Sequence, residues 1–178
     1  MSILANQKGN RTYLAVSLLG KSLSLDIKYR SNPIIEFDKE DNRLILCLPK
    51  KYKTMKNIDI INMSIEKMYD EIAEVEIENA MEKIRLILGY APEDYKIERM
   101  KDSFCKVKGK VVKVNPDIVK YSKKIIETTL VQAFCKTKYK TNSKAYEQAL
   151  VNGMKKYEDF KYSIIRNKKV SSRIRKVS

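Results

Sequence analysis

The segment that decides the fold runs from Lys108 to Lys136 and reads KGKVVKVNPDIVKYSKKIIETTLVQAFCK. Lys108-Gly109 separates two short apolar runs, which predicts a β-hairpin with strands at 104–107 and 110–114. Asn115-Pro116 then predicts a helix start, because asparagine caps helices and proline fits the first helical position. Apolar residues at three- and four-residue steps continue this helix over 116–139. The sequence therefore predicts a hairpin followed directly by a helix.

A long amphipathic helix is expected before the hairpin, at Ser64–Leu88, followed by a strand at Tyr95–Met100. Ser64 is a good N-cap, and Gly89 is a suitable stop. The polar face of this helix carries four carboxylates, at Glu71, Glu74, Glu78 and Glu82. Carboxylates spaced evenly along a helix do not converge on one point. We interpret them as a solvated face rather than as a metal site.

Short strands are expected nearer the N-terminus, at 13–18, 23–29, 34–37 and 44–48, with a hairpin turn at 38–42. Ser143 predicts the start of a last helix. Residues 164–178 read as an irregular basic tail, ordered on binding. The sequence therefore predicts an α+β protein with a β-rich segment at 1–62, a core at 63–163 and a basic tail at 164–178.

Positive charge is concentrated in the C-terminal half of the chain. The formal net charge is +15, from 37 Lys and Arg against 22 Asp and Glu. Residues 96–178 carry 23 of the basic residues and 7 of the acidic ones. Such a field attracts polyanions. The alternative is a lysine-rich surface that only keeps the protein in solution.

The chain has no histidine and three cysteines, Cys47, Cys105 and Cys135, far apart in sequence. This spacing predicts neither a disulfide framework nor a zinc ribbon, and indicates a reducing, cytoplasmic location. The missing histidine removes the commonest metal ligand and general base. Apolar runs such as Leu44–Leu48 are too short to cross a membrane, and we see no secretory signal.

Four phrases resemble the YgjP-like and SprT-like zinc metallopeptidases. The segment at 86–101, LILGYAPEDYKIERMK, is similar to the part of that family that ends a helix and enters the first strand of the zincin core. The segment at 108–131 is similar to the strand, Asn-Pro turn and helix entry that follow there. IIEFDKEDNRLILCLPKKY at 34–52 resembles its N-terminal hairpin, and 142–161 the segment after its third metal ligand. The resemblance implies a zincin-like core and a metal-dependent hydrolase.

The residues at the family's motif positions contradict that activity. An ungapped overlay places the two helical histidine positions on Gln132 and Lys136, the catalytic glutamate on Ala133 and the third histidine on Asn142. Neutral amides are weak ligands, a lysine places a cation where the metal would lie, and alanine accepts no proton. We therefore expect no metal, no cofactor and no catalytic residue.

A binding function fits the remaining residues. Lysines surround the hairpin and the end of the following helix, with Tyr139 or Phe104 available to stack on a base. The predicted nucleic-acid-binding residues are Lys106, Lys108, Lys110, Lys113, Lys136, Lys138, Tyr139, Lys140, Lys144, Lys168, Lys169, Arg173 and Arg175. We predict a non-catalytic protein that binds nucleic acid or joins a nucleic-acid-handling complex, since SprT-like relatives work near DNA. The alternatives are a protein-interaction scaffold and a hydrolase of altered chemistry.

Overall fold

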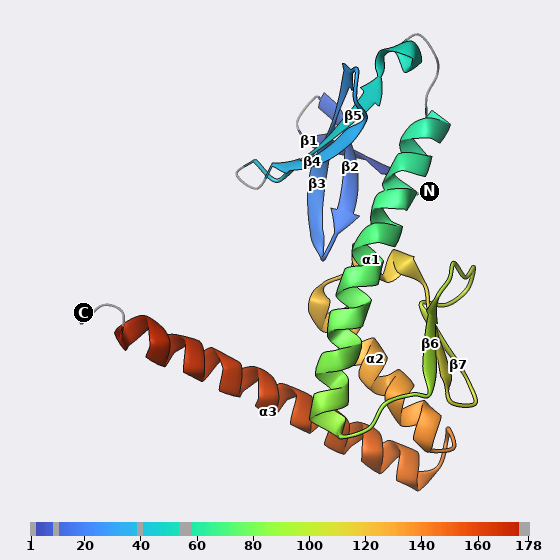
Figure 1. Ribbon diagram of the computed structural model, residues 1–178, viewed down its shortest axis with the longest axis vertical. Coiled ribbons are helices and arrows are strands. Elements are labelled where there is room, and N and C mark those ends of the chain that lie inside the picture. The colour runs from blue at the N-terminus through green and yellow to red at the C-terminus, as the bar shows by residue number, and fades with distance from the viewer. Residues whose placement is uncertain (1–2, 9–10, 39–40, 54–57, 175–178) are drawn as a thin grey trace. The chain divides into compact units, whose positions relative to one another are not determined.

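The computed structural model describes residues 3–8, 11–38, 41–53 and 58–174, and side chains within 14–36, 38, 41–53 and 58–160 (Figure 1). The predicted α+β class is confirmed: strands come first, and helices and a second small sheet follow. The predicted order of long helix, strand, hairpin and two further helices is also confirmed. Among the described residues, no helix is both long enough and apolar enough to span a membrane.

The chain divides into two compact units, neither of which is continuous in sequence. Unit 1 comprises Met1–Glu76 and Pro116–Lys123, and unit 2 comprises Ile77–Asn115 and Lys124–Ser178. Helix α1 (Ile58–Leu88) contributes to both units. The boundary expected at residue 62 falls inside this helix.

Unit 1 contains a five-stranded sheet with the order β1-β2-β3-β5-β4. The strands are β1 (Ile3–Lys8), β2 (Arg11–Leu18), β3 (Lys21–Arg30), β4 (Ile34–Asp38) and β5 (Arg43–Pro49). The predicted β4–β5 hairpin is confirmed, and β3 pairs with β5 in parallel. Residues 44–48 of β5 are all buried, which is why this strand reads as a continuous apolar run.

The β2–β3 hairpin rests on a second segment of unit 1. Leu19 and Gly20 both have positive φ, at 49° and 78°, as a two-residue hairpin loop requires. The amide of Leu19 donates a hydrogen bond to the carbonyl oxygen of Val119 at 2.7 Å. Val119 lies in the 3₁₀ helix η2 (Pro116–Lys120), so residues 116–123 belong to this unit. A second short 3₁₀ helix, η1 (Lys50–Tyr52), follows β5.

Helix α1 begins six residues before its predicted start. The expectation that Ser64 caps it was wrong: the Ser64 hydroxyl donates to the carbonyl of Ile60 one turn back, as serine does inside a helix. The predicted end is confirmed, because Gly89 has a φ of 76° and its amide bonds to the carbonyl of Arg85. The predicted solvated acidic face is also confirmed, since Glu71, Glu74, Glu78 and Glu82 are all exposed.

Unit 2 contains a three-stranded sheet with the order β6-β8-β7. The strands are β6 (Asp94–Ile97), β7 (Cys105–Lys108) and β8 (Val111–Val114). The predicted hairpin is confirmed as the antiparallel β7–β8 pair, with Gly109 at a φ of 62° in its turn. Strand β6 ends at Ile97 rather than at Met100, and it pairs with β8 in parallel.

The single helix expected at 116–139 is in fact the 3₁₀ helix η2 followed by α2 (Lys123–Lys138). The amide of Tyr121 bonds to the carbonyl of Ile118, three residues back, so the first turn is too tight to run on as an α-helix. Asn115, a buried polar residue, donates through its side-chain amide to the carbonyl of Met100 at 2.7 Å. It thereby holds the loop that leads into β7.

The last helix, α3, runs from Lys144 to Ile174. Its predicted cap is confirmed, because the Ser143 hydroxyl accepts a hydrogen bond from the amide of Tyr146 at 3.1 Å. The prediction of an irregular tail from residue 164 was wrong as far as Ile174. Helix extension adds one hydrogen bond per residue fixed, and lysine and arginine are good helix formers, so a basic sequence continues a helix already begun.

Candidate nucleic-acid interface

A groove in unit 2 gathers six of the thirteen predicted binding residues. It lies along β7 and the C-terminal end of α2, and its volume is about 770 Å³. Among the described residues that line it, five are lysines and none is acidic. The lining residues are Cys105, Lys106, Val107, Lys108, Gly109, Lys113, Lys136, Tyr139, Lys140 and Thr141. The groove therefore combines a cluster of cations with one aromatic ring.

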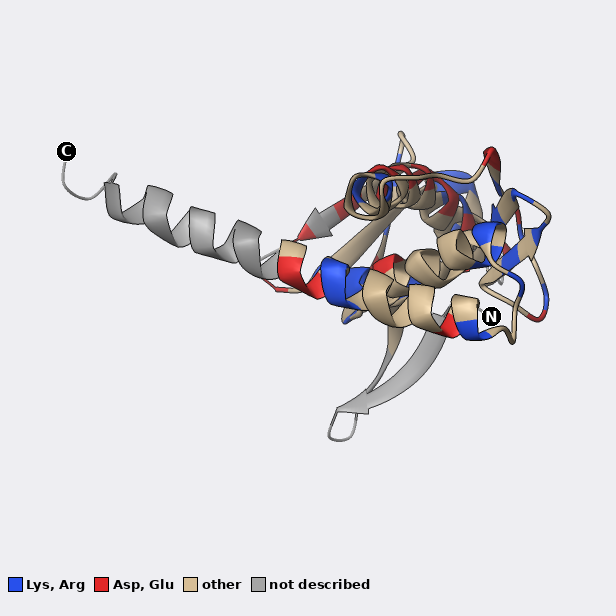
Figure 2. Ribbon diagram, turned by 90° about the horizontal axis from the view of Figure 1, so that it is seen from below, with Lys and Arg blue, Asp and Glu red and all other residues tan. Residues whose placement is uncertain are grey.

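Strand β7 presents its lysines by simple alternation. Lys106 and Lys108 are exposed, whereas Cys105 and Val107 between them are half-buried, because successive side chains of a strand point to opposite faces. The turn that reverses the chain into β8 is Gly109-Lys110, one residue later than the predicted Lys108-Gly109, because Lys108 ends β7 and pairs with Val111. Figure 2 marks the basic positions of these strands in blue.

Three lysines form a row across the small sheet. Lys113 on β8 is the register partner of Lys106 on β7 and of Lys96 on β6. Register partners on neighbouring strands carry their side chains on the same face. Lys113 also forms an ion pair with Glu98, with 2.7 Å between Nζ and Oε1. Lys96 was not predicted as a binding residue, because the parallel pairing of β6 with β8 left no local signal in the sequence.

The end of α2 supplies the other wall of the groove. Lys136 and Lys140 are four residues apart, and both are exposed. The backbone of Tyr139 is held by its amide, which donates a hydrogen bond to the carbonyl of Cys135 at 2.9 Å. The ammonium group of Lys138 lies 4.7 Å from the ring centre of Tyr90 and 5.7 Å from that of Tyr139. This cation supports the Tyr139 ring at the groove wall.

Several predicted binding residues are not among the residues that line the groove. Lys110 forms an ion pair with Glu93 in the loop before β6, Lys138 lies over the two tyrosine rings, and Lys144 is exposed at the start of α3. Lys168, Lys169 and Arg173 belong to α3 by their backbone, with side chains beyond those described, and Arg175 lies outside the described residues. Phe104, predicted as a stacking residue, is 39% exposed next to the groove.

The four residues that the overlay aligns with the zinc motif lie on α2 and just after it. Gln132 and Lys136 are exposed one turn apart, whereas Ala133 between them is buried. Asn142 has a φ of 68° in the link to α3. A carboxamide, an ammonium group and a second carboxamide do not form a zinc donor set, so these residues do not fit the metal. In the described part of the chain, no three His, Cys, Asp or Glu side chains are grouped to hold a metal ion.

The thiols of unit 2 are shielded. Burial raises the pKa of Cys105 from 9.0 to about 11, although the nearby charge of Lys136 acts in the opposite direction. Burial also raises the pKa of Cys135, and the hydrogen bond from the Tyr90 hydroxyl partly offsets this rise. A thiol with a raised pKa is protonated near neutral pH and is a poor nucleophile.

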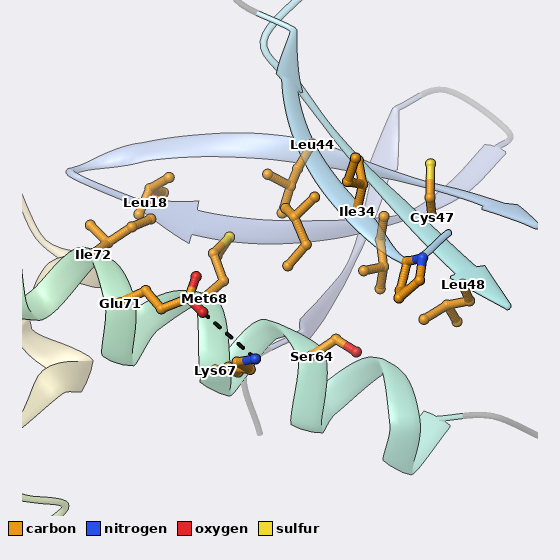
Figure 3. Close-up of a pocket in the computed structure, with 13 residues that line it drawn as sticks. Leu18, Ile34, Leu44, Cys47, Leu48, Ser64, Lys67, Met68, Glu71 and Ile72 are labelled. Carbon is orange, nitrogen blue, oxygen red and sulfur yellow. Dashed lines mark ion pairs between the residues drawn. The ribbon is translucent and has the colours of Figure 1, made fainter. Parts of the chain in front are cut away.

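Unit 1 has a separate, largely apolar groove of about 550 Å³ between its sheet and the first half of α1. Figure 3 shows Ile34, Leu44 and Leu48 on the strand side. On the helix side lie Met68 and the Lys67–Glu71 ion pair, whose Nζ and Oε1 atoms are 3.8 Å apart. Ile34 is 50% exposed. This groove offers apolar surface and little charge.

Comparison of the chain with models of known protein families, with curated proteins and with solved structures found no match.

Proposed function

We propose that the protein binds nucleic acid through the groove between β7 and the end of α2, without catalysing a reaction. The observation that supports this most is the composition of the groove. Five lysines and Tyr139 line it, and no described lining residue is acidic. Because like charges repel one another, the clustering of these lysines slightly destabilises the folded protein unless an anion is bound.

The lysines favour attraction to the phosphate backbone over reading of the bases. An ammonium group is a compact point charge without the planar fork with which arginine grips a guanine or a phosphate. Contacts from lysine to phosphate release counterions and carry no sequence information. The expected binding is therefore indifferent to sequence and steeply dependent on salt.

We further propose that unit 2 derives from a zincin core. The order of α1, β6, the β7–β8 hairpin, α2 and α3 supports this, together with the phrases at 86–101 and 108–131. Gln132 and Lys136 are exposed one turn apart on α2, as the overlay with the two helical histidines of those enzymes requires. On this view, the groove is the former substrate cleft, now lined with cations.

Loss of catalysis follows from the chemistry of the same positions. Ala133 cannot accept a proton from water, and the ammonium group of Lys136 repels a divalent cation. The thiol of Cys105 lines the groove but is held protonated by burial. The chain has no histidine to activate that thiol.

The test is an equilibrium titration of a labelled oligonucleotide of mixed sequence, followed by fluorescence anisotropy. The decisive variant is Lys106→Gln/Lys140→Gln, which removes two groove cations from different elements. The matched control is Lys155→Gln/Lys156→Gln, because both lysines are exposed on α3, are not among the lining residues and change the net charge equally.

Wild type and the α3 control should bind alike, and the groove variant should bind at least tenfold more weakly at physiological salt, as expected for two lost phosphate contacts. Equal weakening by both double variants would mean that only net charge matters and would contradict a specific groove. No binding by the wild-type protein would contradict the function itself.

A second candidate function is protein binding by unit 1, favoured by its apolar groove. Ile34 and Ile35 are 50% and 38% exposed on the edge strand β4, beside that groove. Exposed apolar residues on a sheet edge are typical of interaction sites. Capture of one defined protein from nuclease-treated host extract, abolished by Ile34→Glu and unaffected by Lys106→Gln/Lys140→Gln, would support it. Equal capture by the wild type and Ile34→Glu would contradict it.

A further inference from the structure

We infer that the ligand of this groove is a single strand with an unstacked base, rather than a duplex. This inference rests on the proposed function and narrows it to one class of nucleic acid. It draws on three observations: the size of the groove, the position of Tyr139 and the row of lysines that leads away from it.

The size of the groove suits single nucleotides. Its volume of about 770 Å³ is in the range of pockets that hold small organic ligands, and it is open to solvent. A double helix is a rigid cylinder whose bases are stacked inside, so it presents phosphates and base edges to such a groove rather than the faces of its bases. A single strand can place individual nucleotides between β7 and the end of α2.

Tyr139 is an aromatic lining residue on a rigid support. Its amide is bonded to Cys135, and Lys138 lies over its ring and over the ring of Tyr90. A tyrosine at a groove wall can stack only on a base that has left its own stack. In a duplex every base is already stacked on its neighbours, so a duplex gains nothing from Tyr139.

The lysines define a path for the phosphates of such a strand. Lys140 follows Tyr139 directly in sequence and Lys136 precedes it by three residues, while Lys106 lines the groove from β7. From Lys106 the row continues through Lys113 to Lys96 across the sheet. Neighbouring strands are about 4.8 Å apart, so this row spaces its cations closely enough to follow the flexible backbone of one strand. A basic track next to a stacking ring is typical of proteins that bind single strands.

The experiment compares probes of one sequence at one salt concentration: a DNA strand, an RNA strand, the DNA strand annealed to its complement, and an abasic strand of equal charge. Each is titrated against the wild-type protein, Tyr139→Ala and Tyr139→Phe. Thermal unfolding of each variant is measured alongside, and Tyr139→Phe preserves the ring if Tyr139→Ala unfolds.

At least one base-bearing single strand should bind about tenfold more tightly than the duplex. Tyr139→Ala should weaken its binding about tenfold and leave binding of the abasic strand unchanged, while Tyr139→Phe should bind like the wild type. The DNA and RNA arms identify the preferred sugar. Duplex binding as tight as that of both single strands, or an equal loss on base-bearing and abasic strands, would overturn the inference and leave the proposed function intact. If no probe bound, both this inference and the proposed function would be contradicted.

Discussion

Lys106 and Lys113 lie directly opposite each other on the antiparallel strands β7 and β8. Two ammonium groups in this relationship repel each other, and the Glu98 carboxylate is paired with Lys113 rather than with Lys106. The sheet therefore carries an unfavourable contact on the face where its lysines gather. A bound phosphate would relieve this repulsion. The same lysines that lower the stability of the sheet would therefore favour the proposed binding.

Lys106→Thr should therefore separate stability from binding. Threonine suits a strand, and its hydroxyl does not repel Lys113, so the free energy of unfolding should stay the same or rise, by at most about 1 kcal/mol. Affinity for a single-stranded oligonucleotide should fall. Chemical denaturation and anisotropy on the same sample measure both. A loss of stability together with unchanged affinity would contradict the role given to Lys106.

Glu127→Ala should destabilise unit 2 strongly. The Glu127 carboxylate accepts hydrogen bonds from Lys83 of α1, at 2.7 Å, and from the Tyr157 hydroxyl of α3. Its side chain is only 15% exposed, so its removal leaves Lys83 without this partner in a poorly solvated site, at a cost of about 3 kcal/mol. Glu158→Ala is the matched control: it breaks the more exposed pair with Lys124 and should cost less than about 1 kcal/mol. Equal losses of unfolding free energy for the two variants in urea denaturation would contradict the structural role given to Glu127.

Gly20→Ala should destabilise unit 1 more than Gly109→Ala destabilises unit 2. Both glycines have positive φ, at 78° and 62°, so both substitutions strain the backbone by about 1 kcal/mol. A Cβ atom at Gly20 would also lie 2.9 Å from the Cβ of Ser122, whereas one at Gly109 would meet nothing within 4 Å. The difference between the two losses of unfolding free energy measures the cost of the close contact between a Cβ atom at residue 20 and Ser122. Equal losses would mean that the hairpin tip does not rest on residue 122.

Alkylation of Cys105 should need unusually high pH. Because burial raises its pKa from 9.0 to about 11, iodoacetamide should label it slowly at pH 8, with a rate that rises towards pH 11. In the unfolded chain this thiol keeps its ordinary pKa, so it loses its proton at a lower pH than in the folded protein. The contribution of Cys105 to the free energy of unfolding is therefore fully present below about pH 9 and is lost as the pH rises towards about 11. Peptide mass spectrometry separates Cys105 from the other thiols, and the unfolded chain is the control. Rapid labelling in the folded protein at pH 8 would contradict the shielding.

Local patterns in the sequence were sufficient for most elements. The glycine between two short apolar runs predicted the β7–β8 hairpin, although its turn lies one residue later than expected. The expectation that this hairpin and the end of the next helix border one groove, where Lys106, Lys136 and Tyr139 meet, came instead from the resemblance to the zincin arrangement.

Features that depend on distant contacts could not be predicted. Lys96 joins the lysine row only through the parallel pairing of β6 with β8, and Lys110 is paired with Glu93. The start of α1 was placed too late because Ser64 is equally suited to capping and to bonding back within a helix. The break before α2 likewise depends on η2, which packs with the β2–β3 hairpin of unit 1.

Phosphate binding in this groove is tested most directly by the salt dependence of single-strand affinity, measured for the wild type and for Lys106→Gln/Lys140→Gln. The logarithm of the association constant should fall linearly with the logarithm of salt concentration, by about 0.7 for each phosphate contacted. If both lysines contact phosphates, the slope of the variant should be shallower by about 1.4. Parallel lines for the two proteins would show that these lysines do not contact phosphates and would contradict a nucleic-acid-binding groove at this place.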